Sequence, residues 1–396
     1  MKKFYIHYFY STNMTSKEYL AKMKNIQENI LYYLDGEANL EEKYQCLKDM
    51  FDGLKINCNK HELKSLLYLL LKISNHHHRE SDFFNKIEKI LQIFKDDLKK
   101  SFSNSELFHI FRSNKRIILF LFEENIIVMN EYVFKKMEKF EYRIAKYPIY
   151  FSPEIKPFIN ENWFPKYYKN DVFNTNAWIE EIKEDLPDDF YSKRKIGEND
   201  NFICQLIRKD LIEDFIIYVN QNMYPLDSII NRSKYETNNF LLKKHKITLI
   251  EYATFYGSIQ IFNYLRFNNV KLTSSLWEYA VHGQSAEIIH LLEELHIEPI
   301  DLDKKKNFFE QIFIESIKCH HIDIANYIRN NYLQDKNENS NDSLINCIEY
   351  YNFILMENDL IDQSSFFYLC KYDYYFLAVC LLNELSIDIN KITIYN

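Results

Sequence analysis

The sequence predicts an all-α protein, in which pairs of short helices stack into an α-solenoid behind a helical N-terminal region. Glycine and proline number only 5 and 7 among 396 residues, too few for the tight turns of sandwiches, barrels and propellers. Apolar residues recur at three- and four-residue spacing through residues 16–98, as on one face of a helix. A segment of the second half also recurs along the chain, as stacked repeats require.

Four amphipathic helices are expected in the first hundred or so residues, because the helical spacing of apolar residues is interrupted three times there. Thr15 or Ser16 can cap the first of them, with Glu18 in its first turn. The interruptions fall at Asp35-Gly36, at Asp52-Gly53 and at residues 75–79. The expected helices cover residues 16–34, 40–51, 61–73 and 83–98.

Three parts are expected along the chain, whose 396 residues exceed the roughly 250–300 at which one core usually stops growing. Four of the seven prolines lie at positions 148, 153, 157 and 165, so this stretch cannot be one continuous helix. Asp200 is expected to cap the helix that opens with Asn201-Phe202. The parts are a helical N-terminal region with degenerate repeats (1–146), a proline-containing connector with short helices near 176–184 (147–199), and a repeat array (200–396).

The repeat is clearest in residues 248–270. There a small residue, Ala253, precedes a turn at Gly257, and Ile261 and Leu265 follow on a second helix. The small residue suits a first helix that must approach its neighbour closely. One helix pair cannot bury both of its faces, so the units are expected to stack and share a core. The residues aligned with Ala253 are Ala280, Ser316, Ser343 and Cys370, at spacings of 27, 36, 27 and 27.

The turn between the two helices is a check on this alignment. Gly257 suits a left-handed backbone conformation, which glycine adopts without a steric penalty. The second copy has Gln284 at that position, with Gly283 one residue early, and the third copy has His320. Histidine is among the residues enriched at left-handed positions after glycine.

Charge and composition favour some classes of protein over others. The formal net charge is −8, which argues against a nucleic-acid binder, although the run 243–246 (KKHK) leaves binding to nucleic acid or to an acidic membrane open. Seven cysteines occur at irregular spacings without a C-x-x-C motif, as in a reducing compartment. The start of the chain lacks the pattern of a signal peptide, and no apolar run is long enough for a membrane span. We therefore expect a soluble intracellular protein of the cytoplasm or nucleus.

The segment Thr248–Ala253 resembles the opening of an ankyrin repeat, T-P-L-H-x-A, in its threonine, its apolar third residue and its alanine. It has leucine in place of proline and glutamate in place of histidine, and the 27-residue spacing implies that the fingers are reduced to loops. More widely, the chain is similar to an expanded protist family of ankyrin-repeat proteins that carry a domain of unknown function. The stretches that carry this similarity are 61–79, 114–126, 193–212, 248–283 and 315–328.

The resemblance implies a protein-interaction array; it does not imply an enzymatic activity. In ankyrin arrays the variable positions just before the turn glycine face a concave groove. By alignment these positions are Phe255, Tyr256, His282, Lys318 and Cys319. Aromatic residues supply much of the energy of protein interfaces, so this groove suits a protein partner. We expect a scaffold or adaptor that binds an unidentified protein, without catalytic residues or a cofactor, and its oligomeric state is left open.

The alternative is a metal-binding or hydrolytic protein that uses Cys319, His320 and His321, with His282 and His290 one unit away. A metal site needs several nitrogen or sulfur ligands that converge at about 2.0–2.3 Å, and the repeat alignment gives each of these residues a structural place instead. The run 76–78 is HHH, but consecutive residues of a helix point about 100° apart and bind one metal poorly. A polar turn is expected there, and no metal site is predicted.

Overall fold

The computed structural model describes residues 14–36, 38–80, 82–141, 147–159, 185–244, 246–333, 340–356, 361 and 364–385. In these ranges the regular structure is helical, with one isolated β-bridge between Ile229 and Thr248, so the all-α prediction is confirmed. None of the helices in these ranges is long and apolar enough to cross a membrane.

The chain divides into two units. The terminal unit combines Met1–Leu66 with Asn337–Asn396, and the central unit is Leu67–Lys336. The boundaries that the sequence suggested, after residues 146 and 199, both fall inside the central unit. The helix α3 (Lys60–His76) begins in the terminal unit and ends in the central one.

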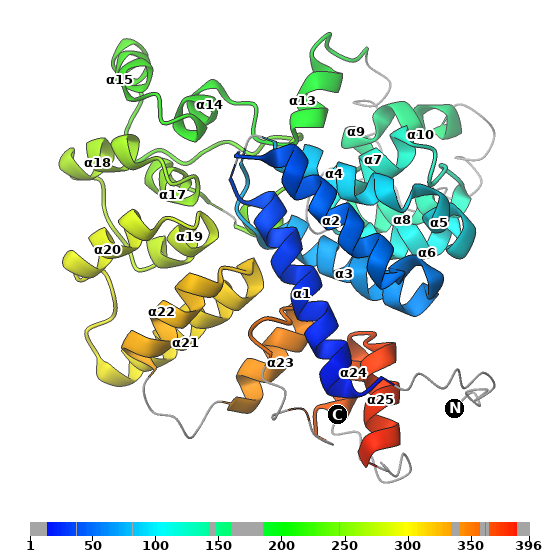
Figure 1. The fold of residues 1–396 in the computed structure, drawn as a ribbon. Coiled ribbons are helices and arrows are strands. Elements are labelled where there is room, and N and C mark those ends of the chain that lie inside the picture. The colour runs from blue at the N-terminus through cyan, green and yellow to red at the C-terminus, as the bar shows by residue number, and fades with distance from the viewer. Residues whose placement is uncertain are drawn as a thin grey trace, which may run out of the picture. The chain divides into compact units, whose positions relative to one another are not determined.

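The terminal unit brings the first and the last described helices together. The first helix, α1 (Ser16–Leu34), packs on α2 (Leu40–Leu54) and on the last helix, α25 (Tyr375–Leu385). Tyr19 of α1 stacks on Phe376 with ring centroids 5.1 Å apart. The remaining elements of this unit are η1 (Ile56–Cys58), α23 (Ser340–Tyr350) and α24 (Phe366–Lys371), and Figure 1 shows α1 beside α25.

The predicted N-terminal helices are largely confirmed. The first matches α1 in both bounds, and Thr15 caps it in a capping box with Glu18. The break predicted at Asp52-Gly53 is wrong, because α2 continues through Gly53 to Leu54. The helix predicted over residues 83–98 is two helices, α4 (Phe83–Ile93) and α5 (Lys95–Ser101), which meet at Phe94.

The first part of the central unit is a cluster of short helices. The proline-containing stretch is not one continuous helix, as predicted, because α9 (Tyr147–Tyr150) and α10 (Ser152–Ile159) are separated at Phe151, although Pro157 lies inside α10. The short helices expected near residues 176–184 lie outside the described residues. The other helices here are α6 (Asn104–Phe111), α7 (Lys115–Glu123), α8 (Glu131–Glu141) and α13 (Phe190–Ile196).

The second part of the central unit consists of helix pairs. The first helices are α14 (Phe202–Arg208), α17 (Leu249–Phe255), α19 (Leu276–His282) and α21 (Leu302–Cys319), and each packs on the next. The second helices are α15 (Ile212–Gln221), α18 (Ile259–Phe267), α20 (Ala286–Glu294) and α22 (Ile322–Tyr332). In Figure 1, α15, α18 and α20 follow one another in a row outside α14, α17 and α19.

The start of α14 corrects one prediction. Its N-cap residue is Asn201 rather than Asp200. The carboxylate of Asp200 accepts a hydrogen bond from Ser233 Oγ at 2.7 Å and pairs with Lys193 Nζ at 3.1 Å. The Asp200 carboxylate is therefore bound by Ser233 and Lys193 and does not cap α14.

Every pair in this part of the chain closes through the same turn. A left-handed residue follows each first helix, and the amide after it bonds the carbonyl five residues back, which satisfies a carbonyl at the helix end. The left-handed residues are Asp210, Gly257, Gln284 and His320, so the predictions at Gly257 and His320 are confirmed. The amide-to-carbonyl bonds are Leu211 to Leu206 (3.1 Å), Ser258 to Ala253 (2.9 Å), Ser285 to Ala280 (3.2 Å) and His321 to Ser316 (3.1 Å).

The same turn recurs in the terminal unit, at positions that differ from those in the repeat alignment. The left-handed residues there are Tyr351 and Asp373. The amide of Asn352 bonds the carbonyl of Cys347, and that of Tyr374 bonds the carbonyl of Leu369. Cys347 and Leu369 therefore take the position that the alignment gave to Ser343 and Cys370, because the intervening loops differ in length.

Gly283 marks a close approach between two consecutive first helices. The φ of Gly283 is −81°, which any residue can adopt, so a left-handed backbone conformation is not the reason for a glycine at this position. A Cβ at this position would lie 2.6 Å from the carbonyl oxygen of Phe255 and 2.9 Å from that of Thr254. Only glycine lets the end of α19 approach the end of α17 this closely.

Replacement of Gly283 by alanine is expected to destabilise the central unit by about 1–3 kcal/mol, because the new methyl group overlaps backbone atoms that cannot rotate away. The matched control is Gly53→Ala. Gly53 is exposed and helical, and nothing lies within 4 Å of its would-be Cβ, so alanine is expected to stabilise by about 0.5–1 kcal/mol. Urea unfolding followed by circular dichroism measures both, and equal effects of the two substitutions would contradict the close approach.

Candidate functional site

The structure places most of the predicted groove residues in the interior. Phe255, His282 and Cys319 are 4%, 1% and 0% exposed. The ring of Phe240 stacks on those of His282 and Phe255, with centroids 3.8 and 5.7 Å apart. Phe240 belongs to the short helix α16 (Asn239–Lys243), so a partner could reach Phe255 and His282 only if α16 moved away.

The other two predicted groove residues are partly buried. The Tyr256 ring packs edge-on against Phe255 at 5.0 Å, and the Lys318 ammonium donates to Glu315 at 2.6 Å. The sequence-based prediction contains no helix at the position of α16. The signal for it was Asn238, whose side chain accepts from the amides of Phe240 and Leu241 as an N-cap does.

Cys319, His282 and Glu315 form a buried hydrogen-bonded chain. The Cys319 Sγ lies 3.3 Å from His282 Nδ1, and His282 Nε2 lies 3.1 Å from the Glu315 carboxylate. Burial lowers the pKa of His282 and raises that of the Cys319 thiol well above its ordinary value. A neutral imidazole that accepts from the thiol and donates to the carboxylate satisfies all three groups.

Cysteine, histidine and glutamate are the residue types of a nucleophilic triad. The state of the Cys319 thiol argues against that chemistry. A cysteine nucleophile reacts as the thiolate and must meet its substrate, whereas this thiol is protonated and fully buried. The arrangement instead fixes the end of α21 against α19. It therefore gives the hydrolytic alternative no geometric support.

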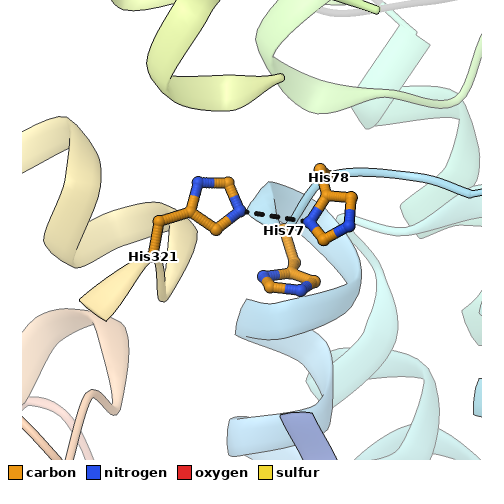
Figure 2. Close-up of side chains that lie close together, drawn as sticks. All are labelled: His77, His78 and His321. Atoms are coloured by element: carbon orange, nitrogen blue, oxygen red, sulfur yellow. Dashed lines mark hydrogen bonds between the residues drawn. The ribbon is translucent and has the colours of Figure 1, made fainter. Parts of the chain in front are cut away.

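A second cluster joins three histidines from distant parts of the sequence. The side chains are those of His77, His78 and His321, and we call this group the histidine cluster (Figure 2). One nitrogen from each lies within 4.8 Å of the others, and His78 Nδ1 is 3.3 Å from His321 Nε2. His77 and His321 are buried, and the His78 side chain is 17% exposed.

The sequence argument against His77 and His78 sharing a site assumed that both are helical. The helix α3 ends at His76, so both residues lie beyond it, and the angular spacing of a helix does not separate them. The prediction of a turn at this place is confirmed, but His77 is a buried residue of that turn. His320 and Cys319, which the sequence grouped with His321, do not belong to the cluster.

Backbone carbonyls fix two of the three rings. His77 Nδ1 donates to the carbonyl of Cys319 at 2.8 Å, and His321 Nδ1 donates to that of Val281 at 2.7 Å. A carbonyl only accepts, so both Nδ1 atoms carry the proton, and both Nε2 atoms carry the lone pair in the neutral rings. Burial and the neighbouring histidines lower the pKa of His321 well below its ordinary value, which keeps that ring neutral.

A lysine side chain is buried at the start of α7. Lys115 is 2% exposed, its Nζ lies 4.9 Å from the ring centre of Tyr150, and no hydrogen-bond partner is found for it among the described residues. Burial lowers its pKa to about 7, and Glu236 only partly offsets this effect. A cavity of about 30 Å³ lies beside Glu236, which is room for water but not for a metabolite.

Comparison with known proteins assigns no function, so a function has to be inferred from the geometry of the structure. No family model, no curated protein and no solved structure matches this chain. The similarity to ankyrin-repeat proteins therefore rests on the residues quoted for it above.

Cys319 is expected to resist alkylation in the native protein, because its thiol is buried and protonated. Iodoacetamide should label the exposed Cys46 and Cys58 within minutes and label Cys319 only as fast as the central unit unfolds. Peptide mass spectrometry at successive times measures each site. If Cys319 were labelled as fast as Cys46 under native conditions, the conclusion that the Cys319 thiol is buried and inert would be wrong.

Lys115 is expected to make stability rise with pH. Between about pH 7 and 10 the unfolded chain keeps a proton on this amine that the folded chain has lost, so the free energy of unfolding increases with pH. Relative to Lys115→Met, the wild type should gain up to about 1.4 kcal/mol per pH unit in this window. Urea titrations from pH 7 to 9 measure the difference, with the exposed Lys209→Met as control. Parallel profiles of wild type and Lys115→Met would contradict a neutral buried amine.

Proposed function

We propose that this protein is a non-enzymatic scaffold in which ankyrin-like helix pairs bind a protein partner. The observation that supports the proposal best is the repeated turn of the central unit. The same left-handed residue and the same hydrogen bond close consecutive pairs, and each first helix packs on the next. Stacked pairs of this kind make extended surfaces that suit protein recognition.

The surface we assign to the partner lies on the outer row of helices. Large apolar side chains are exposed at or directly after the ends of α15, α18 and α20 and in the loop that precedes α21. Exposed apolar side chains that are contiguous mark interaction sites. We call this set the outer apolar row. Its members are Met223 (88% exposed), Phe267 (73%), Leu295 (37%) and Ile300 (98%).

The charges around this row indicate the chemistry of the partner. Glu294 and Asp301 are exposed beside Leu295 and Ile300, and Glu213 and Asp214 are exposed on α15. The chain as a whole carries a net charge of −8. A protein segment with apolar anchors and basic flanks therefore fits this face, since complementary charge steers association and anchors supply affinity.

Nucleic acid or an acidic membrane fits less well as the partner. In the run 243–246, residue 245 lies outside the described residues, and Lys244 is engaged within the unit. The Lys244 ammonium donates to Glu278 at 2.5 Å and lies 4.7 Å from the ring centre of Phe240. Part of the basic run is thus already neutralised by the protein.

The double substitution Phe267→Ser/Ile300→Ser is expected to abolish partner binding without unfolding the protein, because both side chains are exposed. Loss of two apolar anchors should weaken the complex by at least about 30-fold, the equivalent of 2 kcal/mol. The measurement is affinity purification from native lysate read by mass spectrometry. Tyr32→Ser/Tyr191→Ser is the control, since these exposed aromatic residues lie outside the row.

The proposal requires a protein that wild type and control both recover and the Phe267→Ser/Ile300→Ser variant loses. Equal recovery by the wild type and that folded variant would remove the outer apolar row from the proposal. Failure to recover any specific protein would count against the scaffold itself.

A further inference from the structure

We propose that the histidine cluster binds one divalent transition-metal ion of the zinc class. The proposal is independent of the scaffold function, because it concerns buried groups between helix ends and not the outer apolar row. It also departs from the sequence-based expectation of no metal site.

The first argument is distance. In a tetrahedral zinc site with Zn–N bonds of about 2.0–2.1 Å, two ligand nitrogens lie about 3.3 Å apart. His78 Nδ1 and His321 Nε2 are separated by 3.3 Å. The longest separation in the cluster, up to 4.8 Å, would have to shorten by about 1.5 Å.

The second argument is the support behind the ligands. Histidines that bind metals in proteins usually donate their other ring nitrogen to a carbonyl or a carboxylate, which sets the tautomer and orients the ring. His77 and His321 already do so, to the carbonyls of Cys319 and Val281. His78 Nε2 lies 4.0 Å from the Glu80 carboxylate. When Nδ1 of His78 binds the metal, its proton moves to Nε2, where it faces that carboxylate.

The third argument is electrostatic. The helices α3 and α21 end at His76 and Cys319, next to the cluster, and the carbonyl ends of helices carry partial negative charge. That field favours a cation. Three imidazole nitrogens suit zinc, copper, nickel or cobalt ions far better than magnesium or calcium, which prefer oxygen ligands.

The coordination that follows is three protein nitrogens and one open position. The described residues place no fourth histidine, cysteine or carboxylate in this group, so water would complete the tetrahedron. The buried thiol of Cys319 is engaged with His282 instead. Solvent reaches the cluster past His78, the least buried of the three. The ion would fasten the turn after α3 to the turn between α21 and α22.

The test uses the full-length protein, stripped with a chelator and then titrated with Zn²⁺ alone in a calorimeter, with bound zinc measured by elemental analysis. His78→Gln is the site variant, because its partly exposed side chain is the least critical of the three for folding. His290→Gln is the matched control, since it removes an imidazole of the same unit that is 61% exposed. Circular dichroism checks the folding of both variants.

Wild type and His290→Gln are expected to bind one zinc per chain, and His78→Gln to bind it at least tenfold more weakly. The same stoichiometry and affinity in His78→Gln, or no zinc bound by the wild type, would overturn the proposal. A second measurement does not depend on any variant. Co²⁺ bound to the wild type should show the intense visible bands of tetrahedral coordination, and a weak spectrum like that of the aqueous ion would also overturn it.

Discussion

The rest of the structure depends on one turn, in which a left-handed residue lets the amide after it reach the carbonyl five residues back. This bond satisfies a carbonyl at the end of each first helix and sets the direction of the second helix. Glycine, glutamine, aspartate and histidine all occupy the left-handed position. Because the hydrogen bond belongs to the backbone, the pairs keep one geometry while their side chains diverge.

Close packing between consecutive pairs follows from that turn. Since each turn ends the first helix at a comparable point, the ends of α17 and α19 come together, and Gly283 is the residue that permits the contact. Two carbonyls at the ends of α19 and α21 accept from histidine rings. The carbonyl of Cys319 accepts from His77, and that of Val281, which also accepts from the amide of Gln284, accepts from His321.

The bonds that His77 and His321 donate to these carbonyls hold two of the three imidazoles of the cluster in the interior. Each ring that donates to a carbonyl is held in one tautomer and leaves a nitrogen with a lone pair. The histidine cluster is therefore a by-product of satisfying helix ends, and a metal ion is what such a set of nitrogens suits. The outer apolar row is a different product of the same stacking, because its side chains stay exposed among the described residues.

The sequence by itself determined most of the helices, the cap of α1 and the turns of the clearest repeats, since periodicity, capping residues and left-handed preferences are local. It placed the cap of α14 one residue early and did not predict α16. It placed α1 to the residue and predicted the turns at Gly257 and His320. Only the tertiary structure decided what those elements contact. It paired α1 with α25, put α16 over Phe255 and His282, and brought His77 to His321. No local pattern encodes these contacts, because they depend on loop lengths and on partners outside the local segment.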